Sequence, residues 1–166
     1  MSALIILATA LTDVDALVAE SAEYLSRRLG GTPPLDPPTL PRDAAGALSA
    51  IDAWAGTDVA NWRQELNRWF DAHAPVRLVP DQELNSLLRR ASKQGTKLAC
   101  ASALPSEPLE LTLQHLGCAR AFKAVAAGDG SLEDALSAAR AALGGHDTPL
   151  VRTRAELVVA LGGVTR

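Results

Sequence analysis

The sequence predicts a three-layer α/β fold, in which helices cover both faces of a mostly parallel sheet and a small helical segment is inserted. Short apolar runs typical of buried strands lie at residues 4–8, 97–101, 122–127 and 149–153. Helical patterns separate the later runs, as in sheets built from strand–helix–strand units. The 166 residues, 48% of them hydrophobic, are enough for one domain with a sizeable core.

The first apolar run is followed by small residues and then by polar ones. In an open α/β sheet, the loop after the carboxyl end of such a strand is where ligands are held, so this loop bears most directly on function. A helix is expected over residues 15–29, with Gly30-Gly31 ending it. Asp13 or Asp15 can serve as its N-cap, and we prefer that structural role to a catalytic one.

Residues 32–41 hold five prolines, which predicts an extended connector. Two helices are expected next, at residues 43–55 and at residues 59–72, the second capped by Thr57. All three tryptophans lie between positions 54 and 70. We interpret them as the core of a small helical unit; the alternative is a docking surface, because Trp is enriched at interface hot spots.

Asp81 is expected to cap a helix that Gly95 ends, and the strand at 97–101 then leads to Ser102. Ser106 is expected to cap the next helix, and Gly117 to end it. After the strand at 122–127 a further helix follows Ser131, and the strand at 149–153 leads to a terminal helix. Cys100 and Cys118 are expected to be reduced and buried.

The residues around the first strand resemble the first motif of the haloacid dehalogenase-like (HAD) phosphatase superfamily, an apolar strand followed by Asp-x-Asp-Gly-Thr. Without gaps, Thr12 matches the motif's threonine. Ala8 takes the place of the nucleophilic aspartate, Ala10 that of the general acid/base, and Leu11 that of the glycine. A methyl group can neither attack phosphorus nor hold a proton or a magnesium ion. In this register, the family's usual chemistry is not available.

The sequence resembles the second motif of this superfamily more closely than it resembles the first. The helix, the turn at Gly95, the strand and Ala101-Ser102-Ala103 look like the family's phosphate-binding segment, with Ser102 as its hydroxyl. A serine at a strand end is also a good turn residue.

Two other parts of the family's site are missing. No lysine occurs in residues 124–166, and Arg152 and Arg154 stand where the family places an acidic pair. Magnesium would then have little reason to bind, so no metal or cofactor is expected. An anion is more compatible with Thr12, Ser102, Arg152 and Arg154, although arginines in a loop are most often simply solvated.

The resemblance implies a Rossmann-like, HAD-like core at residues 1–15 and 77–166, with a helical cap at 16–76. It leaves three hypotheses open. In the first, the protein is a catalytically inactive pseudophosphatase with a binding or association role, for example toward a small anion or phosphorylated metabolite. Alternatively, Asp13 and Asp15 form the catalytic pair of a shifted register, in a magnesium-dependent phosphatase of small phosphorylated metabolites. In the third hypothesis, the aromatic cap binds a protein partner or a second copy of the chain.

Composition excludes other classes. A net charge of −3 without a basic stripe argues against nucleic acid. The N-terminus has no basic segment ahead of its apolar run, and no stretch is long enough to span a bilayer. We therefore expect a cytoplasmic protein that does not associate with membranes.

Overall fold

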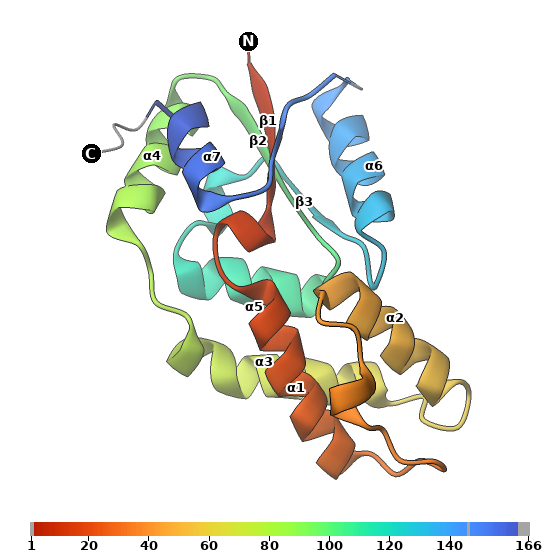
Figure 1. Ribbon diagram of the computed structural model, residues 1–166. Helices are drawn as coiled ribbons and strands as arrows, with labels where there is room; N and C mark the ends of the chain where they lie inside the picture. Colours follow the sequence, from red (N-terminus) through yellow and green to blue (C-terminus); the bar gives the residue numbers. More distant parts are fainter. Residues whose placement is uncertain (1, 146, 163–166) are drawn as a thin grey trace.

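The computed structural model describes residues 2–145 and 147–162, and within them the predicted α/β class with a parallel sheet is confirmed (Figure 1). Four strands form one sheet in the order β3-β2-β1-β4, and every neighbouring pair is parallel. They are β1 (Ala3–Leu7), β2 (Lys97–Ser102), β3 (Ala124–Ala127) and β4 (Leu150–Val151). Because the strands are parallel, their carboxyl ends meet at one edge of the sheet.

Helices cover both faces of the sheet, giving three layers (Figure 1). On one face, Ile5 and Leu7 of β1 pack in a cluster with Ala135 and Ala139 of α6 (Leu132–Leu143). The alternate residues of β1, such as Ile6, belong to a second and larger cluster on the other face. That face is covered by α4 (Gln82–Lys93), α5 (Ser106–Leu116) and α7 (Arg154–Ala160).

Residues 14–77 form a helical unit beyond the carboxyl edge of the sheet (Figure 1). It contains α1 (Val14–Arg28), the 3₁₀ helix η2 (Pro37–Thr39), α2 (Ala44–Ala55) and α3 (Trp62–Arg77). Trp62, Trp69 and Phe70 are buried, which confirms that they belong to a core. Trp54 is half-buried, and its indole N–H donates to the carbonyl of Pro33 over 2.8 Å.

The predicted bounds of α3 were wrong at both ends. The helix begins at Trp62 after Asn61, not after a Thr57 cap, because Gly56 has a positive φ of 50° and the following residues form turns. It also continues past residue 72 to Arg77, since Ala74 lies one helical turn after Phe70 and is buried like it.

Three smaller expectations also need correction. Ser106 is the first residue of α5 and does not cap it; Pro105 precedes the helix without a side-chain bond. The third strand begins at Ala124 because Phe122 still closes the 3₁₀ helix η3 (Ala119–Ala121). The strand predicted at 149–153 is shorter, and only Leu150–Val151 pair as β4. The Pro-rich connector at residues 32–41 is not extended throughout, because it includes the short helix η2.

Other local expectations are confirmed. Asp13 caps α1, Asp81 caps α4, and Gly117 ends α5 with a positive φ of 78°. Cys100 and Cys118 are free and buried, and burial raises the pKa of the Cys118 thiol to about 11.

Within the described ranges, no helix combines the length and the apolar character that crossing a membrane requires.

Glu65 joins α3 to α1 through a polar cluster. Its side chain is only 7% exposed, yet it receives a hydrogen bond from the Tyr24 hydroxyl (3.0 Å) and ion pairs with Arg68 (2.7 Å) and Arg28 (3.4 Å). Burial raises the pKa of Glu65, but the Tyr24 hydrogen bond and the two guanidinium groups outweigh it, so the pKa lies below its ordinary value. The ionised form is therefore the one that the fold stabilises.

This lowered pKa predicts how stability depends on pH. The ionised Glu65 side chain stabilises the folded state fully above its ordinary pKa of 4.5. This stabilisation is lost as the pH falls through the lower pKa that Glu65 has in the folded protein. In thermal unfolding between pH 7 and pH 3, the Tm difference between the wild type and Glu65→Gln should stay constant above pH 5 and shrink below 4.5. Glu23→Gln, at an exposed position of α1, is the control and should show no such change. A Glu65→Gln difference that persists at pH 3 would contradict this assignment.

Candidate functional site

A cavity of about 190 Å³ lies where the carboxyl ends of β1 and β2 face the start of α1 and α2. Its walls are mostly apolar, with four polar side chains: Thr9, Asp15, Asp43 and Ser102. In open α/β sheets this edge is where ligands bind, which makes the cavity the first candidate for a functional site.

The tip of β1 carries no carboxylate. The strand ends at Leu7, and Ala8, which is 1% exposed, begins the 3₁₀ helix η1 (Ala8–Ala10) and lines the cavity. The register pairs Leu7 with Ala101, so Ala8 comes level with Ser102 at the end of the neighbouring strand. Ala10 is 2% exposed and packs in the large hydrophobic core. A methyl group thus occupies the strand tip that faces Ser102.

Both aspartates of the shifted register bind helix N-termini. Asp13 accepts a hydrogen bond from the backbone N–H of Ala16 (3.0 Å) and caps α1. Asp15 reaches across to α2 and accepts from the N–H of Ala44 (2.8 Å) while lining the cavity. Of the two, only Asp15 is a lining residue of the cavity that holds Ser102. Carboxylates at these positions are stabilised by the unpaired N–H groups and by the helix dipole.

Each of the two hydroxyl groups that line the cavity already makes a hydrogen bond within the protein. Ser102 is 4% exposed, and its Oγ accepts from the N–H of Leu104 over 3.1 Å, as in a turn. The Thr9 hydroxyl donates to the carbonyl of Arg152 over 3.5 Å, which ties the loop after β1 to the end of β4. The Ser102 hydroxyl hydrogen remains able to donate to a ligand.

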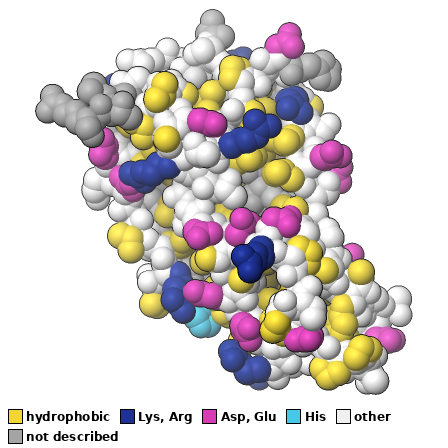
Figure 2. Space-filling view, in the orientation of Figure 1, with side chains coloured by type: hydrophobic (Ala, Val, Ile, Leu, Met, Phe, Trp, Pro, Cys, Tyr) yellow, Lys and Arg dark blue, Asp and Glu magenta, His cyan; other side chains and the backbone are white. Residues whose placement is uncertain are grey.

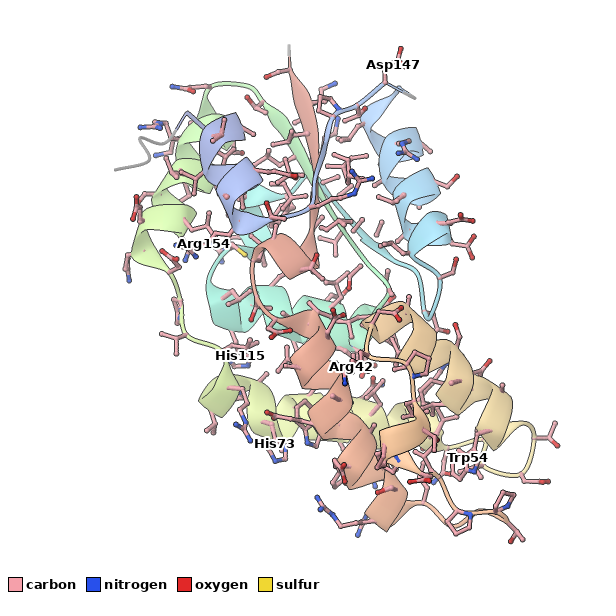
Figure 3. All side chains as sticks on the ribbon, in the orientation of Figure 1. Arg42, Trp54, His73, His115, Asp147 and Arg154 are labelled. Atoms are coloured by element: carbon pink, nitrogen blue, oxygen red, sulfur yellow. The ribbon has the colours of Figure 1, made fainter. Side chains whose placement is uncertain are left out.

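The four residues considered for anion binding do not meet at this cavity. Ser102 is the only one of them among its lining residues. The guanidinium of Arg154 forms an ion pair with Asp81 at the start of α4, and Figure 3 shows it on the α4 side of the molecule. The backbone N–H of Arg152 donates to Glu156 (2.8 Å), while the arginine side chain is exposed.

The cavity is therefore negatively charged. Its lining includes Asp15 and Asp43 but neither Lys nor Arg among the residues described. Asp43 caps α2 by accepting from the N–H of Gly46 over 2.8 Å. Figure 2 shows acidic side chains across the middle of the molecule, with a basic side chain directly beside them. A phosphate group placed here would meet two lining carboxylates and no lining cation to offset them. In the part of the chain that is described, no three His, Cys, Asp or Glu side chains gather as a metal site.

Side-chain hydrogen bonds and ion pairs connect the helical unit to the loop that follows β3. Both oxygens of Asp129, in the loop after β3, accept from Nε of Arg63 on α3 at 3.1 Å. The same guanidinium forms an ion pair with Asp52 of α2 (3.2 Å), and the Ser49 hydroxyl of α2 donates to the carbonyl of Gly130 (2.9 Å). Sequence patterns gave no signal for these contacts, because their partners lie 66 and 81 residues apart.

Comparison with known proteins gives the fold. No family profile matches the chain, and no curated protein matches it in sequence. Among solved structures, β-phosphoglucomutase from Clostridium difficile superposes with a TM-score of 0.62 at 14% identity, covering 98% of this chain and 82% of the other. A candidate phosphatase from the same organism superposes with a TM-score of 0.56 at 15% identity and the same coverage. Both neighbours have folds of the HAD superfamily. The chain has the haloacid dehalogenase-like fold.

Proposed function

We propose that this HAD-like protein does not hydrolyse phosphate esters and that its role is binding or association. The observation that carries the proposal is Ala8, whose methyl group stands at the tip of β1 facing the cavity. Nucleophilic catalysis at this position requires an oxygen that can attack phosphorus, and alanine has none.

The charge of the cavity supports the same conclusion. Phosphoryl transfer depends on cations that neutralise the transferred group, usually a metal ion together with Lys or Arg. Here Asp15 and Asp43 are the charged lining residues, and each already accepts a hydrogen bond from the N-terminus of α2. A small neutral or cationic molecule suits such a cavity better than a phosphorylated metabolite does.

The test is an assay of purified protein with p-nitrophenyl phosphate and MgCl2. We expect the wild type to release p-nitrophenol no faster than the buffer. Asp15→Asn is the matched variant, because it removes one of the two carboxylates that line the cavity with Ser102 while keeping a side chain that can accept from Ala44. Turnover by the wild type that Asp15→Asn abolishes would overturn the proposal.

One observation keeps the magnesium-dependent phosphatase as a second candidate: Asp15 does line the cavity together with Ser102. In that case Asp13 would be the other carboxylate of the pair, and Asp13→Asn should also abolish turnover. Asparagine caps helices about as well as aspartate, so we expect Asp13→Asn to change the free energy of unfolding by less than about 0.5 kcal/mol. Urea unfolding of this variant checks that any lost activity reflects chemistry and not a lost fold.

The proposed association role has to use side chains other than the buried aromatics. Trp62 and Trp69 are 1% and 4% exposed, so a partner on the helical unit would meet its exposed outer faces instead. Size-exclusion chromatography of the wild type over a range of concentrations tests for a second copy. A single monomer peak at every concentration would count against self-association.

A further inference from the structure

A second and larger cavity, which we call the groove, lies between α4 and the turn that follows α5. Its volume is about 710 Å³, within the range of roughly 300–1,000 Å³ typical of sites for small ligands. It shares no lining residue with the cavity at the tip of β1. The groove is therefore a separate candidate site, and a ligand bound there is independent of the function proposed for that cavity.

Three cationic side chains line this groove. Arg89 and Lys93 lie four residues apart on α4 and so share one face of that helix, while Arg120 comes from η3 on the other side. No Asp or Glu is among the described lining residues, and none of the three cations forms an ion pair with a described carboxylate. In a chain with a net charge of −3, this is a local concentration of positive charge.

Asn85 adds a buried polar group at the same groove. It is 9% exposed, and its amide N–H₂ donates to the carbonyl of Leu116 over 2.9 Å. Among the described residues this is the only hydrogen bond that its side chain makes, which leaves a second amide hydrogen for a ligand. Gly117 packs against the same amide: a Cβ there would lie 3.1 Å from the Asn85 nitrogen. The side chain is thus held in place by the turn after α5.

We propose that this groove binds a small polyanion that carries at least two phosphate groups. Two arginines offer planar pairs of donors that match phosphate oxygens, and Lys93 adds a compact positive charge. Because the groove brings three cations together, it favours a ligand with several negative charges over a single carboxylate. No aromatic side chain is among the described lining residues, so nothing there would stack on a nucleobase.

Isothermal titration of the intact protein with tripolyphosphate at low ionic strength tests the proposal. We expect saturable binding to one site, weakened about tenfold or more in the double variant Arg89→Gln/Arg120→Gln. Both arginines are exposed, so the variant should keep the thermal midpoint of the wild type. Arg27→Gln is the matched control, since it removes an exposed arginine on α1 that lies outside the groove, and it should leave the affinity unchanged.

Three results would overturn the proposal. The first is no binding of tripolyphosphate to the wild type. The second is an equal loss of affinity in Arg27→Gln and in the double variant, which would mean unspecific attraction. The third is tighter binding of hexaglutamate than of tripolyphosphate, which would assign the groove to an acidic peptide.

Discussion

Replacing Trp62 with alanine is expected to lower the free energy of unfolding by about 3–5 kcal/mol. Trp62 is among the largest fully buried side chains and is 1% exposed. It lies on the face of α3 that also buries Leu66 and Phe70, so its removal leaves a space that these neighbours cannot fill without repacking. Since domains of this size are typically stable by about 5–15 kcal/mol, the variant should lose a large share of its stability.

Urea unfolding followed by far-UV circular dichroism measures this loss. Val76→Ala is the control on the same helix, because Val76 is 78% exposed and its truncation should change the free energy of unfolding by no more than about 0.5 kcal/mol. A loss below about 1 kcal/mol in Trp62→Ala would contradict the core assignment. Such a result would revive the hypothesis that this side chain serves a partner.

Much of the fold could be predicted because its signals are local. An aspartate accepts from an N–H three residues later, so Asp13 and Asp81 mark the starts of α1 and α4 within a few residues of sequence. The apolar runs of β1 and β2 are equally local. The same local logic failed at Thr57, where the turn at Gly56 delays the helix to Trp62.

The candidate site could be predicted only in part, because its contacts join distant residues. The place of Ala8 beside Ser102 depends on two strands whose ends align. Nothing in the sequence near Asp15 indicates that it binds the N–H of Ala44, 29 residues away. Likewise, Arg154 was considered for an anion because it comes after the last strand, whereas its guanidinium pairs with Asp81, the cap of a distant helix.

The loop after β3 joins the sheet to the helical unit, and its geometry depends on Gly128. A Cβ at this position would lie 1.8 Å from the backbone carbonyl oxygen of Ser131, far inside any tolerated contact. That oxygen cannot swing away as a side chain could. The loop is held by the N–H of Gly128, which donates to the carbonyl of Ser102 (2.8 Å), and by that of Gly130, which donates to Ala103 (2.7 Å).

Gly128→Ala is therefore expected to lower the free energy of unfolding by about 1–3 kcal/mol, as overpacking at a constrained site does. The loop must shift, and Asp129 moves with it, which weakens the contact with Arg63 that fastens α3. Urea unfolding measures the loss, and hydrogen exchange should show faster exchange in α2 and α3 than in the wild type. Gly30→Ala is the matched control: a Cβ there meets nothing within 4 Å, so the variant should be as stable as the wild type or slightly more stable. Equal stability of the two variants would mean that the loop relaxes freely, and that the helical unit is not held by it.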